Sequence, residues 1–357
     1  MNSSGVVRGI RAPLSRRADA PHDSGRIHLT PYVATMLPPM DYTGELLQVA
    51  AFVALIAITF ALAAMVLARR YLTSKRTPIR GWARIVLALA AIGCLCFEYG
   101  RYVEPRWLET THTRVTTSRL PAGHRGVRIV HLSDIHSDPK PLVEERLPTR
   151  IADLHPDLIV FTGDCANSEG GMPVFRQLFA DLAKIAPTFV VRGNWDPRER
   201  QGIDIFAGLG VAELDGSSAS IDVAGARVHV VGLAHQSPSR RMGEAISALP
   251  ADGLAIVLNH TPYPDLVPPL LASRVDLMCA GHVHGGQVAL PFYGAILTLS
   301  KFGKRFERGL YPTADGFGFP LYVSRGIGME GGTALRVRFC SRPEIALIEL
   351  VPPTSAN

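Results

Sequence analysis

The sequence predicts an α/β fold, a four-layer αββα sandwich of two sheets between helices, preceded by one or two transmembrane helices. Three observations lead to this architecture. A long apolar run lies near the N-terminus. From about Gly126, short strand-like runs alternate with helical patterns, and a hairpin and further strands follow. Hydrophobic residues make up 47% of the 357 residues, which excludes a largely disordered chain.

The first predicted element is a transmembrane helix at Leu46–Ala68, a run that only Gln48 and Thr59 interrupt. As a helix it would be about 34 Å long, against a hydrocarbon core of about 30 Å. A buried core helix and a cleaved signal peptide are the alternatives. The run lacks an amphipathic face, and it starts too late and is too long for a signal peptide. Residues 1–44 show no periodicity and are expected to form a disordered tail.

A second span is predicted at 82–102, so that the membrane segments occupy 45–102. Its apolar centre is short, but the full stretch would reach about 31 Å as a helix. A monotopic or packed helix is the alternative. The segment between the two runs is strongly basic, and the positive-inside rule places it in the cytoplasm. Two spans put the rest of the chain outside the cytoplasm and one span leaves it inside. The expected location is the cell (inner) membrane, with the side of the globular domain open.

After a linker at 103–125, residues 126–352 are predicted to form the globular domain. Its first part has strands at 127–132, 158–162 and 188–191, separated by helices at 142–154 and 172–185. A hairpin is expected at 220–223 and 226–231, followed by strands at 254–258, 277–279, 321–324, 335–339 and 345–350. Strands that alternate with helices predict sheets whose outer faces are covered by helices.

Polar side chains follow five of these strands directly. The candidate site consists of Asp134, His136, Asp164, Asn194, His260, His282 and His284. Loops at the carboxyl ends of strands converge on one edge of a sheet, so these residues are expected to lie together. In Asp134-X-His136 and His282-X-His284, alternate residues of an extended backbone point the same way. Each pair can therefore aim two ligands at one place.

The residue types of this set indicate a metal site. Imidazole and oxygen donors without a thiolate suit Mn, Fe or Zn. Seven donors with one bridging carboxylate suit two metals, which can clamp the attacking and leaving oxygens of a displacement at phosphorus. Asp164, a short carboxylate after a glycine, is the candidate bridge. Each motif alone is weak evidence, because Gly-Asp at a strand end is usually a turn. The prediction depends on the ordered set of five.

The order D-X-H, G-D, G-N-X-D, N-H and G-H-X-H, from about Leu120 to Leu350, resembles the calcineurin-like metallophosphoesterases. The segments RIVHLSDIH, HVHGGQ and SRGIG resemble the membrane-anchored bacterial branch of that family, similar to UDP-2,3-diacylglucosamine pyrophosphatases. The resemblance implies one metal bound by Asp134, His136 and His284, another bound by Asn194, His260 and His282, and Asp164 as the bridge. It further implies that a metal-bound hydroxide attacks phosphorus, with Asp164, Asn194 and His260 as the catalytic residues.

Trp195 departs from the family pattern, which commonly has a histidine at this position to protonate the leaving oxygen. An indole N–H cannot act as an acid at neutral pH. Either the leaving group needs no proton, which favours pyrophosphates or activated diesters over alkyl monoesters, or another residue supplies the proton. Trp195 and Asp196 are expected to support the metal ligands. The alternatives are that Trp195 only packs beside the metals of a weak or inactive enzyme, and that Asp196 caps a turn.

The segment 301–308 interleaves basic and aromatic residues and contains the candidate substrate-binding residues Lys304 and Arg305. It could dock phosphates or the membrane surface, and a solvated loop is the alternative. The predicted partners are a phosphorylated substrate, of which a lipid-linked one is an example, and membrane lipid. The net charge is +6, but much of it lies beside the apolar run, so nucleic acid is not expected.

The sequence thus predicts a membrane-anchored phosphohydrolase with two divalent metal ions, manganese being favoured over iron or zinc. It would cleave a phosphodiester or pyrophosphate bond, for example in UDP-2,3-diacylglucosamine. The rival functions are an extracytoplasmic phosphomonoesterase or phosphodiesterase with another substrate, and a catalytically weak membrane scaffold. A UDP-linked lipid would be cytosolic, so the side of the membrane discriminates between the first two.

Overall fold

A computed structural model describes residues 43–72, 79–196, 204–235, 237–330 and 336–353. The tail predicted for 1–44 lies outside this part of the chain, apart from its last two residues. Two apolar helices come first, α1 (Thr43–Leu72) and α2 (Gly81–Glu98). The helical course of α2 continues through the short turns η1 (Tyr99–Val103) and η2 (Glu104–Arg106). These helices agree with the two predicted membrane segments.

Both helices are long and apolar enough to cross a membrane, and few of their side chains are buried inside the protein. The core helix of a soluble protein would instead be largely buried, so the exposed apolar surface of α1 and α2 fits a lipid environment. The helices pack against each other at Gly93 of α2. A Cβ atom there would lie 3.2 Å from the ring of Phe60 of α1, so glycine permits the close approach. We conclude that α1 and α2 form a helical hairpin and associate with the membrane.

Two six-stranded sheets form the globular domain. The first contains, in spatial order, β1 (Glu109–Thr116), β14 (Glu344–Val351), β2 (Val127–Leu132), β3 (Leu158–Phe161), β4 (Thr188–Val190) and β5 (Ala212–Glu213). The second contains β12 (Gly309–Tyr311), β13 (Leu321–Val323), β9 (Leu277–Ala280), β8 (Leu254–Asn259), β7 (Ala226–Leu233) and β6 (Ser217–Val223). The central strands β2, β3 and β4 are parallel, as are β7, β8 and β9. Their carboxyl ends carry the predicted site residues.

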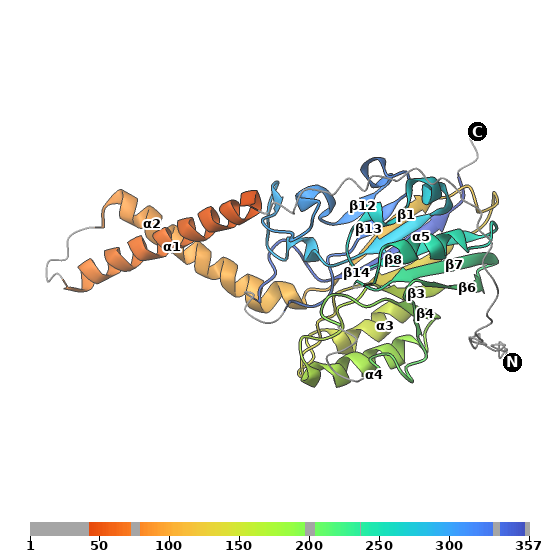
Figure 1. The fold of residues 1–357 in the computed structure, drawn as a ribbon. Coiled ribbons are helices and arrows are strands. Elements are labelled where there is room, and N and C mark those ends of the chain that lie inside the picture. The colour runs from red at the N-terminus through yellow and green to blue at the C-terminus, as the bar shows by residue number, and fades with distance from the viewer. Residues whose placement is uncertain (1–42, 73–78, 197–203, 236, 331–335, 354–357) are drawn as a thin grey trace, which may run out of the picture. The chain divides into compact units, whose positions relative to one another are not determined.

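Helices cover the outer faces of both sheets (Figure 1). The helices α3 (Leu147–Ala152) and α4 (Met172–Leu182) pack on the first sheet, and α5 (Arg240–Ser247) packs on the second. Along β2 the buried side chains alternate. Ile129 faces the core between the sheets, whereas Val130 and Leu132 face the core under α3 and α4. The predicted αββα layering is therefore confirmed.

Three details differ from the sequence expectations. The strand predicted at 335–339 is wrong for the residues described, since Phe339 makes only an isolated bridge with Val288. The physical reason is Arg338, whose wholly buried guanidinium bonds loop carbonyls. The predicted linker 103–125 contains β1, which pairs in parallel with β14. The helix predicted at 142–154 is a 3-10 turn, η3 (Glu144–Arg146), followed by the shorter α3.

Candidate metal centre

The seven predicted donors come from loops at the carboxyl ends of five strands. Asp134 and His136 follow β2, Asp164 follows β3, and Asn194 follows β4 in the first sheet. In the second sheet His260 follows β8, and the pair at 282 and 284 follows β9. The two groups meet because the backbone N–H of His282 donates to the carboxylate of Asp134 at 3.1 Å. The structure thus brings all seven side chains together.

One group of donors surrounds His136. Its Nε2 lies 3.2 Å from Nε2 of His284, and that second nitrogen lies 3.4 Å from Oδ1 of Asp134. Two neutral imidazoles cannot both direct lone pairs at each other without a proton or cation between them. The arrangement therefore fits a shared metal ion. Asp134, His136 and His284 have ligand atoms close enough together to hold one.

A second group surrounds Asn194. Its side-chain oxygen lies 2.7 Å from Nε2 of His260 and 2.9 Å from Nδ1 of His282. Asp164 lies between the two groups, because its Oδ2 is 3.4 Å from Nε2 of His136 and 3.3 Å from Nε2 of His260. Amide, carboxylate and imidazole atoms that converge in this way suit a second divalent ion.

The backbone of the site is strained, and the pairs Asp134-X-His136 and His282-X-His284 are not extended as expected. Five of the seven donors have positive φ angles, between 45° and 73°: Asp134, His136, Asp164, His282 and His284. Positive φ is unfavourable for side chains with a Cβ atom, at about 1–3 kcal/mol per residue, and it gathers at functional sites. The surrounding structure must hold these residues in place, which fits a preorganised centre.

Two glycines make room for the carboxylates. A Cβ atom at Gly193 would collide with the carboxylate of Asp164, and one at Gly281 would collide with Asp134. The Gly-Asn and Gly-His steps of the motifs are therefore steric requirements, because each loop crosses directly over a ligand of another strand. The Gly-Asn and Gly-His steps are visible in the sequence, but the contacts that require glycine join distant segments.

Burial keeps three imidazoles neutral. It lowers the pKa of His136 to about 4 and that of His282 to about 3, and it also lowers the pKa of His284 well below its usual value. Burial lowers the pKa of His260 too, but the neighbouring carboxylate of Asp164 outweighs it and raises this pKa to about 9. Neutral imidazoles are ready to bind metal, whereas His260 must release a proton first.

The pKa values of Asp134 and Asp164 are shifted in opposite directions. Burial, together with the charge of Asp164, raises the pKa of Asp134 to about 7. Burial also opposes ionisation of Asp164, yet the imidazoles of His260 and His136 hold the pKa of this carboxyl below its usual range. Asp164 is therefore the permanently charged ligand of the set, which suits a position between two cations.

Asp196 fixes the loop that carries Asp164. Its wholly buried carboxylate accepts hydrogen bonds from the backbone N–H groups of Asp164 at 2.7 Å, Cys165 at 2.9 Å and Gly193 at 3.0 Å. It thus joins the loops after β3 and β4. Of the two predicted roles, ligand support fits these contacts better than capping of the following turn.

Trp195 lies against the first group of donors. Its backbone N–H donates to Oδ1 of Asp164 at 2.8 Å, and its ring meets that of His136 edge-on at 5.5 Å. The indole also hydrogen-bonds the carboxylate of Glu330, a half-buried residue whose pKa is raised by burial. Glu330 was missed in the sequence, because it follows no predicted strand and belongs to no motif.

Two further residues at the site belong to no motif, and of these the sequence favoured a structural role for His235. Arg338 places Nη2 3.4 Å from Nδ1 of His284 and donates to the carbonyl oxygens of Gly328 and Ser341. His235 stacks on His282, with ring centroids 6.1 Å apart. Both contacts join segments far apart in the chain, so local pattern could not reveal them.

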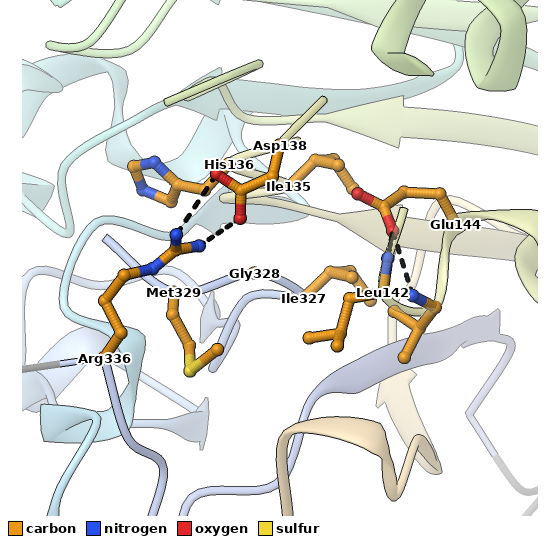
Figure 2. Close-up of a pocket in the computed structure, with 10 residues that line it drawn as sticks. Ile135, His136, Asp138, Leu142, Glu144, Ile327, Gly328, Met329 and Arg336 are labelled. Carbon is orange, nitrogen blue, oxygen red and sulfur yellow. Dashed lines mark hydrogen bonds and ion pairs between the residues drawn. The ribbon is translucent and has the colours of Figure 1, made fainter. Parts of the chain in front are cut away.

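A fourth unpredicted residue, Arg336, lines the same pocket as His136. Figure 2 shows its guanidinium paired with Asp138, two residues after His136. Asn167 also donates to Asp138, at 3.3 Å, and to the carbonyl oxygen of His136, at 2.9 Å. These contacts fix the end of the loop that presents the first two donors.

The predicted substrate-binding residues lie in the turn η8 (Gly303–Phe306). Lys304 donates to the carbonyl oxygen of Tyr293 at 2.7 Å and lies 3.4 Å from its ring centre. Arg305 pairs with Asp315 at 3.1 Å. Their role in substrate binding stays a prediction.

The family model described as calcineurin-like phosphoesterase matches residues 127–286. These residues include all seven donors. The metallophosphoesterase YkuE of Bacillus subtilis (strain 168) is 31% identical over 293 residues, which cover 78% of this chain and 97% of YkuE. The phosphodiesterase YaeI of Escherichia coli (strain K12) is 29% identical over 269 residues, 71% of this chain and 93% of YaeI. The UDP-2,3-diacylglucosamine pyrophosphatase LpxG of Chlamydia trachomatis serovar D is 24% identical over 323 residues, 73% of this chain and 94% of LpxG.

Proposed function

Because the chain belongs to the calcineurin-like metallophosphoesterase family, we propose that it hydrolyses phosphodiester or pyrophosphate bonds with two divalent ions held by the seven donors. The position of Asp164 carries this proposal. One carboxylate oxygen lies 3.4 Å from a nitrogen of His136 and 3.3 Å from a nitrogen of His260, within reach of both donor groups. A bridging ligand in a two-metal site needs this placement. The strained, intact donor set also argues against a catalytically weak scaffold.

The chain's own residues hold and orient the reacting groups. Asp134, His136 and His284 would hold one ion, and Asn194, His260 and His282 the other. When bound, the two ions would make a water nucleophilic at neutral pH and neutralise charge on the phosphoryl oxygens, and manganese, iron and zinc all suit these donors. Asp196 keeps Asp164 at the boundary between the groups. Arg338 adds to burial in keeping His284 neutral.

Trp195 bears on the leaving group. The indole lies where the family commonly has a histidine, and it cannot give up a proton at neutral pH. A nucleotide or phosphate leaves as a stable anion and needs no proton, whereas an alkoxide does. This supports diester and pyrophosphate substrates over alkyl monoesters. Glu330, which receives the indole hydrogen bond, is the candidate for a proton donor if one is required.

Membrane anchorage supports a lipid-linked substrate. The helices α1 and α2 confine the catalytic domain to a membrane surface, where a lipid phosphate is concentrated. LpxG, one of the relatives, is a UDP-2,3-diacylglucosamine pyrophosphatase. A substrate of this chemical class, a lipid joined through a phosphodiester or pyrophosphate, is therefore our first proposal.

The contacts of the helical hairpin bear on which side of the membrane the globular domain lies. The beginning of α1 and the turn η1 that continues α2 both contact the globular domain, through Glu45 with Thr298 and through Gly100 with Arg338. The end of α1 and the beginning of α2, with Arg69, Arg70, Arg80 and Arg84, then lie on the opposite side of the membrane. The positive-inside rule puts that side in the cytoplasm. This arrangement supports the rival reading of an extracytoplasmic phosphodiesterase. Its substrate would be a lipid-linked or exported phosphodiester other than a cytosolic UDP-lipid.

A topology reporter tests the location of the domain. Alkaline phosphatase fused after Asn357 is expected to be active, because it folds only in the oxidising space outside the cytoplasm. The same reporter fused after Arg80 is the matched control and should be inactive. Activity only of the control fusion would place the domain in the cytoplasm and restore a UDP-lipid as the first substrate candidate.

A substrate screen tests the proposed reaction. Full-length protein in lipid nanodiscs, loaded with manganese, is expected to hydrolyse aryl phosphodiesters and pyrophosphates faster than alkyl phosphomonoesters. The reason is that Trp195 leaves a poor leaving group without an acid. Metal-loaded protein that hydrolyses none of the three classes would contradict the proposal, and a preference for alkyl monoesters would contradict the leaving-group argument.

A further inference from the structure

The small hairpin formed by β10 (Ala289–Leu290) and β11 (Gly294–Ala295) presents an apolar tip, Pro291–Tyr293. Phe292 at this tip is fully exposed and has a positive φ of 65°, which is unfavourable for a bulky aromatic residue. The side chain of Tyr293 is 47% exposed. A strained and fully exposed phenylalanine gains nothing from the domain's own core, so its surroundings outside the domain must be considered.

Hydrogen bonds to neighbouring loops hold the base of this hairpin in place. The N–H of Ala289 donates to Phe339 at 2.8 Å, and that of Ala295 donates to Glu307 at 3.0 Å. Lys304 bonds the carbonyl oxygen of Tyr293 and covers its ring. The structure therefore presents Phe292 outward on a fixed base.

The tip lies level with the start of the membrane helix. The hydroxyl of Tyr293 donates to Oε1 of Gln48 at 2.6 Å. Gln48 is the third residue of the apolar run that begins at Leu46, and it is one of only two polar residues in that run. A residue bonded to Gln48 is therefore at the depth where the hydrocarbon begins, and Phe292 is its chain neighbour.

The chemistry of the tip matches that depth. Tyrosine concentrates at the boundary between headgroups and hydrocarbon, where its ring is apolar and its hydroxyl finds a partner. Lys304 lies over the Tyr293 ring and pairs with Glu307 at 3.5 Å, so its apolar stem can lie along the tip while its ammonium stays at the headgroup level. Phenylalanine supplies the apolar surface that enters the interface.

The same segment connects directly to the metal centre. Thr298 donates to Glu45 in the first turn of α1, from its N–H at 3.3 Å and its hydroxyl at 3.1 Å. The next residue, Leu299, is hydrogen-bonded through its backbone to the imidazole of His282. Two successive residues thus link the membrane helix to a predicted metal ligand.

We infer that Pro291–Tyr293 inserts into the membrane leaflet next to the start of α1 and holds the metal centre at the lipid surface. The inference rests on membrane anchorage by α1 and is independent of whether the centre hydrolyses phosphoesters. The occupant of the exposed surface is lipid, because the tip is continuous with a helix whose apolar face already requires a bilayer.

Quenching by brominated lipids tests this inference. Phe292→Trp is placed in full-length protein that also carries Trp82→Phe and Trp107→Phe, so that the remaining Trp195 gives a constant background. Because Phe292 is fully exposed, the substitution removes no packing. In vesicles of phosphatidylcholine and phosphatidylglycerol, lipids brominated near the headgroup end of the chain should lower the introduced fluorescence by at least about twofold.

Leu270→Trp in the same background is the matched control. Leu270 is 94% exposed. It lies far from the membrane helices, because the nearby Ser273 accepts a hydrogen bond from Arg119, which follows the end of β1 that is remote from α2. It should be quenched no more than the background. Equal quenching at positions 292 and 270, or none at 292, would overturn the inference. So would a blue shift at position 292 that depends on protein concentration and not on bromine, because a second copy would then cover the tip. Quenching at 292 in a protein without phosphodiesterase activity would contradict the proposed function alone.

Discussion

Replacing Asp164 is expected to release both metal ions and to lower phosphodiester turnover by about 10²–10³-fold, the size of effect that loss of one preorganised electrostatic contact can produce. Its carboxylate lies within 3.4 Å of Nε2 of both His136 and His260. It also carries the charge that persists at neutral pH. Its removal would leave each proposed ion with three protein donors and would leave the imidazoles of His136 and His260 without their shared carboxylate.

Asp164→Asn is the sharper variant for this test. Asp164 has a φ of 64°, a conformation that asparagine tolerates better than alanine, so the backbone strain stays nearly unchanged while the charge is lost. Asp164→Ala should give the same loss of metal with additional destabilisation. Asp181→Asn, on the exposed surface of α4, is the matched control and should retain metal and turnover. Full metal retention in the Asn variant, measured by elemental analysis, would show that Asp164 does not bridge.

Trp195→His is expected to raise turnover of alkyl or aryl monoesters with poor leaving groups by up to about 10²–10⁴-fold, the range of general acid catalysis. An imidazole in this position would lie beside His136 and within reach of Glu330, which now accepts the indole hydrogen bond. The carboxylate would favour the protonated imidazole. Pyrophosphate turnover should change little, because its leaving group needs no proton.

The comparison of the two substrate classes decides the outcome. Turnover of monoesters and pyrophosphates is measured for the wild-type protein and for Trp195→His, with Trp195→Phe as the control for lost indole bonding. An equal rise for both classes would remove this explanation of the missing histidine. Glu330→Gln then separates the two remaining possibilities. If Glu330→Gln, with Trp195 retained, hydrolyses diesters more slowly than the wild-type protein, Glu330 is the proton source. If its diester turnover is unchanged, the leaving group needs no proton.

The fold was predictable where strands are short, apolar and buried on both faces. Leu158–Phe161 is a continuous hydrophobic run, and only Arg128 and His131 interrupt Val127–Leu132. Both strands contribute to cores on both sides of their sheet. The edge strand Glu109–Thr116 was missed, because its side chains are mostly polar and only Val115 is buried. The opposite error occurred around Arg338, where apolar neighbours suggested a strand but the buried guanidinium ties loops together.

The seven donors were predictable because each directly follows a strand, so topology alone gathers them. Glu330, His235 and Arg338 could not be found in this way. Each touches the centre through a contact between distant segments, and a single sequence carries no record of such contacts. The membrane-facing tip at Phe292 was missed for the same reason, since only its bond to Gln48 reveals its depth.

Metal stoichiometry tests the central claim most directly. Full-length protein is purified without chelator, loaded with manganese, dialysed and submitted to elemental analysis together with an assay of phosphodiester turnover. The two-metal account predicts about two divalent ions per chain, with turnover lost on chelation and restored as the second ion binds. A single ion at full activity, or activity that survives complete removal of metal, would contradict it.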